Sequence, residues 1–290
     1  MADNIDKDDV TGIDTTGHDW DGIKELNNPL PRWWLWCFYG TIVWGIAYTI
    51  AYPAWPLVNA ATSGVLGYST RAEVAEQIAA VDAQNAEVAQ RLASADLAAL
   101  APDDPAYRYG VAGGASVFLA NCSQCHGAGA AGVQAGGYPN LLDDDWLWGG
   151  DLEAIEYTVR HGIRNDIDPD ARWTEMPAYG DIFSDEEIAA SVEYVLALSG
   201  QEHDAALAEQ GTELFLDNCA ACHGEAGEGI REMGAPNLSD AIWLYGGDRD
   251  TLTETVTYSR FGVMPPWGQR LDEAEIKAVT LYLHQLGGGE

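Results

Sequence analysis

The pattern of apolar and charged positions gives this chain a polar N-terminal segment, one uninterrupted apolar stretch and a long mixed remainder. Residues 33–52 contain no charged side chain, and 20 helical residues at about 1.5 Å each reach the roughly 30 Å of a bilayer core. Pro53 and Pro56 mark the exit, so the pattern predicts a transmembrane helix within residues 33–56. Aromatic side chains flank it on both sides, as in interfacial belts: Trp33, Trp34, Trp36, Tyr52 and Trp55.

A cleaved signal peptide and a buried core helix are the competing interpretations of this stretch. The 32 residues before it carry 8 acidic and 3 basic side chains, unlike the basic leader of a signal peptide. A retained single-span anchor is therefore predicted. Lys24 and Arg32 precede the span and the first base after it is Arg71, so the N-terminal segment, residues 1–32, is expected in the cytoplasm.

Residues 57–108 are predicted to form a helical spacer. Thr70-Arg71-Ala72-Glu73 has the form of a capping box, and an Ala-, Glu- and Gln-rich helix is expected from there to about Leu92. Pro102 and Pro105 end this region. The sequence does not decide between a solvated stalk and a helix that docks against other membrane subunits.

From residue 109 onward the chain contains two copies of one pattern, residues 109–200 and 201–290. Each copy has a helical stretch, a pair of cysteines, a glycine-rich middle and a closing helix, expected at 185–198 and 272–286. Matching residues lie 97 positions apart around the cysteines and 88 apart near the closing helix, so the first copy has nine extra residues. The repeat predicts two small α-rich domains joined near Gly200.

Both copies contain a Cys-x-x-Cys-His motif, at Cys122–His126 and Cys219–His223. Thiols at i and i+3 lie on one face of a short helix, so both can form thioethers to one porphyrin edge while the histidine turns toward the iron. A zinc site would need four convergent ligands, and a thioredoxin-like dithiol would need a βαβ context. The motif, present twice, predicts two covalently bound haem c groups.

Met176 and Met264 are the candidates for the second axial ligand. The chain has 4 methionines, and these two occupy equivalent places in the copies, each followed by proline. Thioether ligation favours ferrous iron and raises the potential relative to two histidines. Met233 has no counterpart and is expected to be a loop residue. The sequence leaves open whether each methionine serves the haem of its own copy or of the other copy.

Several further residues carry weaker expectations. Pro139 and Pro236, 13 residues after each haem histidine, are predicted to offer a backbone carbonyl to its Nδ1–H. Trp146 and Trp243 either line the haem or belong to the core. Cys37, in the apolar stretch, is expected to be a small apolar filler. The other histidines lack counterparts and are expected to be solvated or hydrogen-bonded: His18, His161, His203 and His284.

Charge excludes one class of function. With 14 basic against 46 acidic residues and a net charge of -32, the chain would repel phosphate backbones, which rules out nucleic-acid binding. Residues 109–290 alone contain 31 acids and 8 bases. Such a surface either attracts a basic redox partner or serves solubility, and the sequence favours neither.

Three further segments carry a family resemblance: Thr16-Gly17-His18-Asp19-Trp20-Asp21-Gly22-Ile23, Asn28-Pro29-Leu30-Pro31-Arg32-Trp33-Trp34 and Tyr52-Pro53-Ala54-Trp55-Pro56. With them, the chain resembles, over nearly its whole length, the dihaem CcoP/FixP subunit of cbb3-type cytochrome c oxidase. The resemblance implies a mainly α protein with one N-terminal transmembrane helix, a helical spacer and two tandem class I cytochrome c domains. It also implies a bacterial inner-membrane anchor with periplasmic haem domains.

The resemblance further implies specific roles for residues and partners. The attaching cysteines would be Cys122, Cys125, Cys219 and Cys222, and the axial ligands His126, Met176, His223 and Met264. Electrons would come from a soluble or tethered donor cytochrome c and pass to a monohaem subunit and then to a catalytic haem-copper subunit, which reduces oxygen and pumps protons. The chain would hold no catalytic residue itself, and membrane lipid would surround its anchor.

Other functions compete with this one. Within the same class are the cytochrome subunit of another membrane oxidoreductase, such as a quinohaemoprotein dehydrogenase, and a free-standing anchored shuttle. A dihaem peroxidase would need one haem with an open sixth position, against which two methionine candidates argue. A haem-based gas sensor would bind carbon monoxide tightly in the ferrous state.

Overall fold

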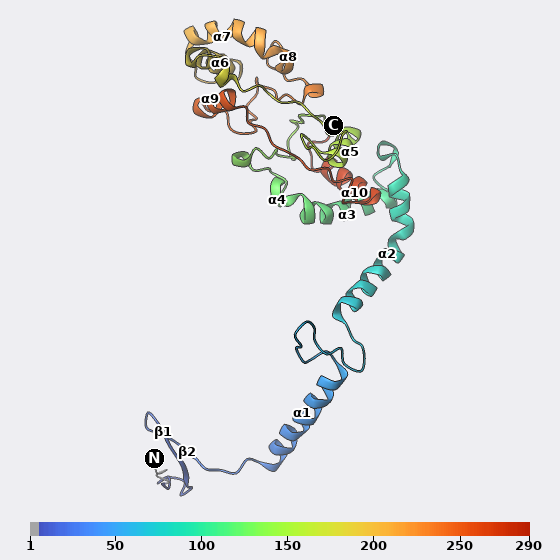
Figure 1. The fold of residues 1–290 in the computed structure, drawn as a ribbon, viewed down its shortest axis with the longest axis vertical. Coiled ribbons are helices and arrows are strands. Elements are labelled where there is room, and N and C mark those ends of the chain that lie inside the picture. The colour runs from blue at the N-terminus through green and yellow to red at the C-terminus, as the bar shows by residue number, and fades with distance from the viewer. Residues whose placement is uncertain (1–5) are drawn as a thin grey trace. The chain divides into compact units, whose positions relative to one another are not determined.

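The computed structural model describes residues 6–290; residues 1–5 of the expected N-terminal segment lie outside this range. The chain divides into two compact units, residues 1–83 and 84–290 (Figure 1). Helices dominate, which confirms the mainly α class. Within the described residues, strands occur in one hairpin near the N-terminus.

The N-terminal hairpin pairs β1 (Thr15–Trp20) with β2 (Ile23–Leu26) in antiparallel register. Asp21 and Gly22 form its two-residue turn, both with positive φ, at 52° and 89°. An Asp-Gly pair is the usual sequence for such a turn because both positions need left-handed backbone. This hairpin was not among the predicted elements.

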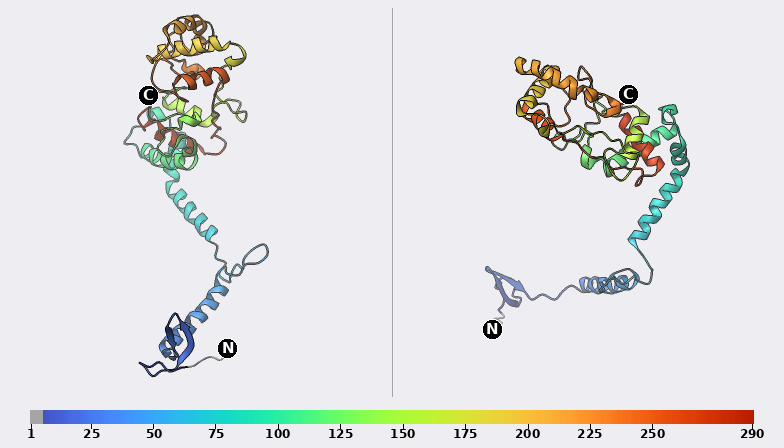
Figure 2. Two further views of the ribbon diagram at one scale, coloured as in Figure 1. Left: turned by 90° about the vertical axis from the view of Figure 1, so that its left-hand side faces the viewer. Right: turned by 45° about the horizontal axis from the view of Figure 1, so that its top comes forward.

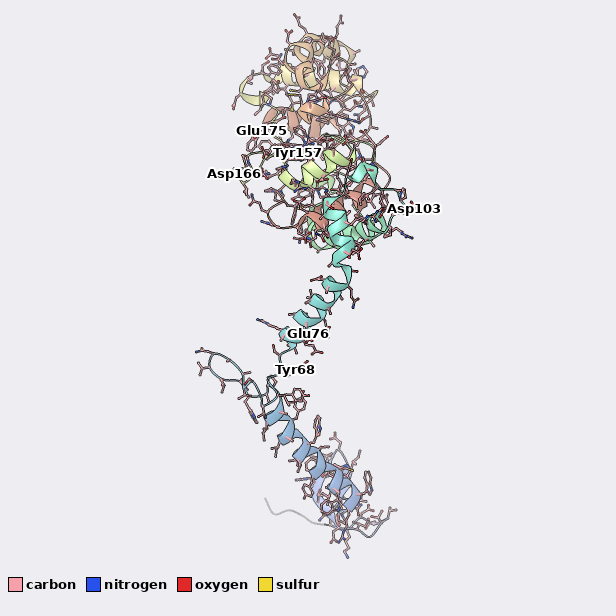
Figure 3. All side chains as sticks on the ribbon, turned by 90° about the vertical axis from the view of Figure 1, so that its right-hand side faces the viewer. Tyr68, Glu76, Asp103, Tyr157, Asp166 and Glu175 are labelled. Carbon is pink, nitrogen blue, oxygen red and sulfur yellow. The ribbon has the colours of Figure 1, made fainter. Side chains whose placement is uncertain are left out.

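Helix α1 (Arg32–Ala51) is the predicted membrane span. It is the one described helix whose length and composition suffice to cross a bilayer, and none of the residues in its most apolar window is buried. Figure 3 shows its side chains projecting on all sides. The following loop returns to the helix end, where Val65 N–H donates to Ile50 O at 2.9 Å and Leu66 N–H to Ala51 O at 3.1 Å. These bonds satisfy carbonyls that the helix itself leaves unpaired.

Helix α2 (Thr70–Ser94) is the predicted spacer helix, with a different cap from the one expected. Ser69, not Thr70, caps it, because Ser69 Oγ accepts from Ala72 N–H at 3.3 Å. The residue three positions after this cap is Ala72, and the Glu73 carboxylate accepts from the Tyr68 hydroxyl instead, so the expected capping box does not form. The end of this helix is not a free stalk, since Leu92 is fully buried within the second unit.

The second unit, residues 84–290, contains the two repeats. Side chains accept from the first N–H groups of most of its longer helices, and matching capping boxes begin the two closing helices, at Ser184 and Asp272. Its helices are η1 (Leu97–Ala99), α3 (Pro105–Asn121), α4 (Ser123–His126), η2 (Gln134–Gly136), α5 (Leu152–His161), η3 (Tyr179–Asp181), α6 (Asp185–Leu198), α7 (Ala205–Asn218), α8 (Ala220–His223), η4 (Arg231–Met233), α9 (Arg249–Tyr258) and α10 (Glu273–His284).

The two repeats exchange their closing helices. Helix α10, which closes the second repeat, packs on α3 of the first, and α6, which closes the first, packs on α7 of the second. Figures 1 and 2 show the resulting groups, α3 with α4, α5 and α10, and α6 with α7, α8 and α9. We call them the α3/α10 half and the α6/α7 half. The repeats therefore divide the sequence near Gly200, whereas each packed half combines elements of both.

Glycines allow the helices of each exchanged pair, α3 with α10 and α7 with α6, to cross at a short distance. A Cβ on Gly114 of α3 would lie 2.1 Å from Ala278 O of α10, and a Cβ on Gly211 of α7 would lie 2.1 Å from Ala190 O of α6. Each crossing is sealed by a fully buried phenylalanine, Phe118 in one half and Phe215 in the other. The same residue types at matching repeat positions thus build two similar cores.

Candidate functional site

Each Cys-x-x-Cys-His motif forms a short helix directly after a long one. Cys122 ends α3, and its carbonyl accepts from Cys125 N–H at 3.2 Å and His126 N–H at 3.0 Å. In the second motif Cys219 O accepts from Cys222 N–H at 3.1 Å and from His223 N–H at 2.9 Å. This single turn puts both thiols of a motif on one side.

The orientation of both motif histidines is fixed by a backbone carbonyl, as the sequence predicts. The Nδ1 atom of His126 lies 3.2 Å from Pro139 O, and that of His223 lies 3.0 Å from Pro236 O. A carbonyl only accepts, so Nδ1 carries the proton in each ring and Nε2 is left with a lone pair. Burial lowers the pKa of both histidines, which keeps them in the neutral form that a metal needs.

The His223 motif faces a large, mainly apolar cavity in the α6/α7 half. Two methionines share this cavity with Cys219, Cys222 and His223: Met176, the predicted ligand, from the first repeat, and Met233 from the second. Apolar side chains of the same half form most of the wall: Val192, Val195, Phe215, Leu238, Trp243, Leu252 and Val256.

The His126 motif belongs to the α3/α10 half, where Met264 of the second repeat packs. Met264 lies against the core built around Phe118, which Cys122 also contacts. Its main chain is fixed by Ile163, with bonds of 2.9 Å in both directions. Met176 and Met264, like the closing helices, therefore each pack in the half that contains the motif of the other repeat.

The residues of each half fit a haem c group. In the His223 cavity two thiols that can attach a porphyrin lie with a neutral imidazole and a methionine thioether in an apolar setting. Imidazole and thioether are the axial donors of a six-coordinate cytochrome, and the α3/α10 half has the matching residues. Burial raises the pKa of Cys122 and of Cys219 to about 11, so both remain protonated thiols at neutral pH. Trp243 lines the His223 cavity, whereas the Trp146 indole N–H donates to Gly288 O and packs on the core.

Three further residues at this cavity were not predicted. Met233, expected to be a simple loop residue, lies in η4 and lines the cavity, as do Arg164 and Arg260. Arg260 could have been identified from the repeat, because it lies 88 positions after Arg172. In the structure both arginines bond the preceding helix in the same way. Arg164 had none, since it lies in the nine residues that only the first repeat has.

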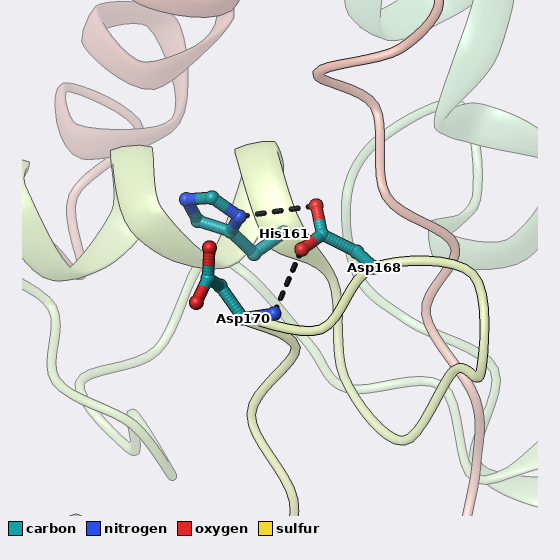
Figure 4. Close-up of side chains that lie close together, drawn as sticks. All are labelled: His161, Asp168 and Asp170. Atoms are coloured by element: carbon teal, nitrogen blue, oxygen red, sulfur yellow. Dashed lines mark hydrogen bonds and ion pairs between the residues drawn. The ribbon is translucent and has the colours of Figure 1, made fainter.

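Three of the other histidines make hydrogen bonds, and the fourth, His18, is exposed, as expected. His203 Nδ1 lies 2.8 Å from Gln201 O, and His284 Nε2 lies 2.9 Å from Glu290 O. His161 Nδ1 lies 3.1 Å from Asp168 Oδ2, and ligand atoms of His161, Asp168 and Asp170 lie within 4.8 Å of one another (Figure 4). The backbone N–H of Asp170 also donates to Asp168, so these contacts fasten the loop that follows α5.

Nearly the whole chain matches known families and proteins. Residues 12–59 match the N-terminal domain of cytochrome oxidase-cbb3, FixP, and residues 110–195 and 206–283 match cytochrome c oxidase, cbb3-type, subunit III. The chain is 61% identical over 278 residues to the cbb3-type cytochrome c oxidase subunit CcoP of Cereibacter sphaeroides, covering 95% of each chain. It is 52% identical over 289 residues to CcoP of Rhodobacter capsulatus, covering 96% of this chain and 97% of that one. It is 48% identical over 283 residues to FixP of Sinorhizobium medicae, covering 98% and 97%.

Proposed function

The chain belongs to the cbb3-type cytochrome c oxidase subunit III family, the CcoP/FixP proteins, and from this membership we propose that it relays electrons within such an oxidase. It accepts single electrons from a donor cytochrome c, soluble or membrane-tethered. It passes them to the monohaem subunit and then to the catalytic haem-copper subunit, which couples oxygen reduction to proton pumping. The proposal gives no residue of this chain a catalytic part.

The observation that carries the proposal is the apolar cavity that brings the second Cys-x-x-Cys-His motif together with Met176 of the first repeat, matched in the α3/α10 half by Cys122 and Met264 on one core. In our proposal Cys122 and Cys125 attach one haem, with His126 and Met264 as axial ligands. The matching residues for the second haem are Cys219, Cys222, His223 and Met176.

The protein's own residues prepare each pocket for electron transfer. Haem c, when bound, supplies a one-electron Fe(III)/Fe(II) couple. The carbonyls of Pro139 and Pro236 hold His126 and His223 in one orientation, and they make Nε2 a stronger donor. The apolar walls exclude water, and a fixed ligand set keeps the reorganisation of the site small.

The proposed location follows from α1 and the family. The helix spans a bacterial inner membrane once, in contact with lipid, with the N-terminal segment in the cytoplasm and both haem-binding halves in the periplasm. A cysteine-accessibility test would check this orientation. A membrane-impermeant reagent added to the outside of spheroplasts should label a single cysteine placed at Ser94 and not one placed at Thr11.

The proposal is tested by purifying the chain from detergent-solubilised membranes through a tag linked flexibly after Glu290. We expect haem b together with haem c in the reduced-minus-oxidised spectrum, co-purifying oxidase subunits and cyanide-sensitive oxygen uptake. Haem c alone, without partners, would replace the proposal with an anchored shuttle. Partners that lack oxygen uptake would indicate a different membrane oxidoreductase.

Site variants test the ligand assignment separately. His223→Ala should abolish the low-spin spectrum of one haem, because no second imidazole in the described residues lines that cavity. His203→Ala is the matched control, since its ring bonds only Gln201 O at the surface, and both haem spectra should be retained. Retention of both spectra in His223→Ala would refute the assignment.

A further inference from the structure

Arg164 connects the two exchanged methionine segments. Its Nε–H donates to Gly262 O at 2.8 Å and its Nη1–H to Thr174 O at 3.1 Å. Gly262 lies two residues before Met264, and Thr174 two residues before Met176, so these carbonyls occupy equivalent places in the two repeats. One guanidinium thus bridges both segments.

The loop that carries Arg164 is held firmly at its base. Arg164 has a φ of 49°, a left-handed conformation that costs a non-glycine residue energy. Its N–H donates to Arg172 O at 2.8 Å, and the buried Asn165 donates from Nδ2 to His161 O at 2.9 Å and to Met264 O at 3.2 Å. These bonds fix the backbone from which the Arg164 side chain enters the His223 cavity.

Arg164 is a partly buried cation without a carboxylate partner among the described residues. Acids outnumber bases 31 to 8 in residues 109–290, yet none of the described carboxylates lies within 4.0 Å of its guanidinium. Glu175, labelled in Figure 3, lines the same cavity and acts on Arg164 only through its charge. Burial lowers the pKa of Arg164, which shows that its charge is poorly solvated there. A negative partner would stabilise a partly buried cation of this kind.

Arg260 lines the same cavity but has little donor capacity left. Its guanidinium bonds Thr255 Oγ1 and Thr251 O, and it pairs with Glu254 at 3.1 Å. Arg164 uses Nε and Nη1 only, so its Nη2 donors have no partner among the described residues. A haem brings two propionate carboxylates into its pocket, and guanidinium is the side chain best suited to bind them in a bidentate manner.

We propose that Arg164 binds a propionate of the haem held by His223, and so supplies that haem with a charge partner from the other repeat. This rests on the haem assignment of the proposed function. The second repeat lacks the nine residues that contain Arg164, so it has no arginine at the equivalent position. A positive charge favours the ferrous form, which carries one positive charge less than the ferric form. Arg164 therefore raises the potential of one haem selectively.

The test is a redox titration of the purified holoprotein and its Arg164→Gln variant. Glutamine keeps one donor for the carbonyls and removes the charge. We expect the midpoint potential of the His223 haem to fall by about 59 mV, which corresponds to a tenfold change in the reduction equilibrium of a one-electron couple. The midpoint potential of the other haem should not change. A Cys219→Ala/Cys222→Ala variant, which lacks that haem, assigns the two midpoints. Arg108→Gln, which removes an exposed charge from α3, is the control and should shift neither.

The outcomes separate this inference from the proposed function. Two methionine-ligated haems with unchanged or equally shifted midpoints in Arg164→Gln would overturn the role of Arg164 alone. A wild-type protein without two such haems would overturn the proposed function. If the variant fails to take up haem, an experimental structure of the wild-type holoprotein decides. We expect a propionate oxygen within about 3.2 Å of an Arg164 nitrogen, and a separation beyond about 4 Å would refute the contact.

Discussion

Replacing Gly114 by alanine should weaken the crossing of α3 and α10. The added methyl carbon would lie 2.1 Å from Ala278 O and 2.7 Å from the Cβ of Tyr282, where real contacts stay beyond 3.0 Å. Neither neighbouring atom can rotate away, because one is backbone and the other is fixed to it. The two helices must therefore separate by about 1 Å in a core that is packed at crystal-like density.

The expected cost follows from two opposing effects. Overpacking of this kind costs about 3 kcal/mol, and the higher helix propensity of alanine recovers about 1 kcal/mol, so the free energy of unfolding should fall by about 2 kcal/mol. Gly113→Ala is the matched control on the same helix, because a methyl group there meets nothing within 4 Å. That variant should gain up to about 1 kcal/mol from propensity alone. The two substitutions should thus differ by about 3 kcal/mol.

The assay is urea unfolding of the holoprotein, followed by circular dichroism and by the long-wavelength sulfur-to-iron absorbance band. Because α10 follows Met264, the loss in Gly114→Ala should appear first at the haem attached beside His126. Equal stability of the two glycine variants would refute the close crossing. Damage confined to the haem beside His223 would refute the exchange of closing helices.

Three further predictions concern ligands, buried charge and partners. Met176→His should lower the midpoint potential of the His223 haem by on the order of 0.1–0.2 V in a redox titration and abolish its sulfur-to-iron absorbance band. An unchanged potential and an unchanged band would mean that the wrong methionine was chosen. Arg249 bonds the buried Glu193 at 2.5 Å and lowers the pKa of its carboxyl from the ordinary value of 4.5. The ionised carboxylate therefore stabilises the fold at pH values above 4.5. This contribution disappears as the pH falls through the lower pKa of the folded state. Glu193→Gln should therefore cost about 1–2 kcal/mol in urea unfolding at pH 7 and much less near pH 3, whereas an equal cost at both would contradict the charge argument. Raising the ionic strength from about 0.01 to 0.15 M should slow electron entry from a basic donor cytochrome at least severalfold in stopped-flow measurements, because the Debye length falls from about 30 to about 8 Å. A rate that does not depend on ionic strength would exclude steering by the acidic surface.

The sequence predicted the local chemistry of the site because that chemistry depends on short spacings. The distance of 13 residues between each haem histidine and its proline was enough to predict the Pro139 and Pro236 carbonyl bonds. The apolar stretch likewise predicted α1, which ends at Ala51, just before Pro53.

The exchange of helices could not be predicted because the two repeats present matching surfaces. Gly114 and Gly211 are equivalent, and so are the alanines they meet, Ala278 and Ala190, so either closing helix fits either crossing. A repeat offset identifies equivalent residues and says nothing about which copy a residue packs on. The N-terminal hairpin is a different case: its Asp21-Gly22 turn was visible in the sequence, but such a pair is a hairpin signal only between two strands.

The exchange of closing helices also determines the order in which the two halves can fold during synthesis. The α6/α7 half has all its helices once α9 has emerged, although it contains the second haem motif. The α3/α10 half, which contains the first motif, waits for α10, the last helix of the chain. Contacts this far apart in sequence form late and expose apolar surface until they do. A chain that ends short of α10 would thus leave the α3/α10 half, whose cysteines are made first, without its closing helix.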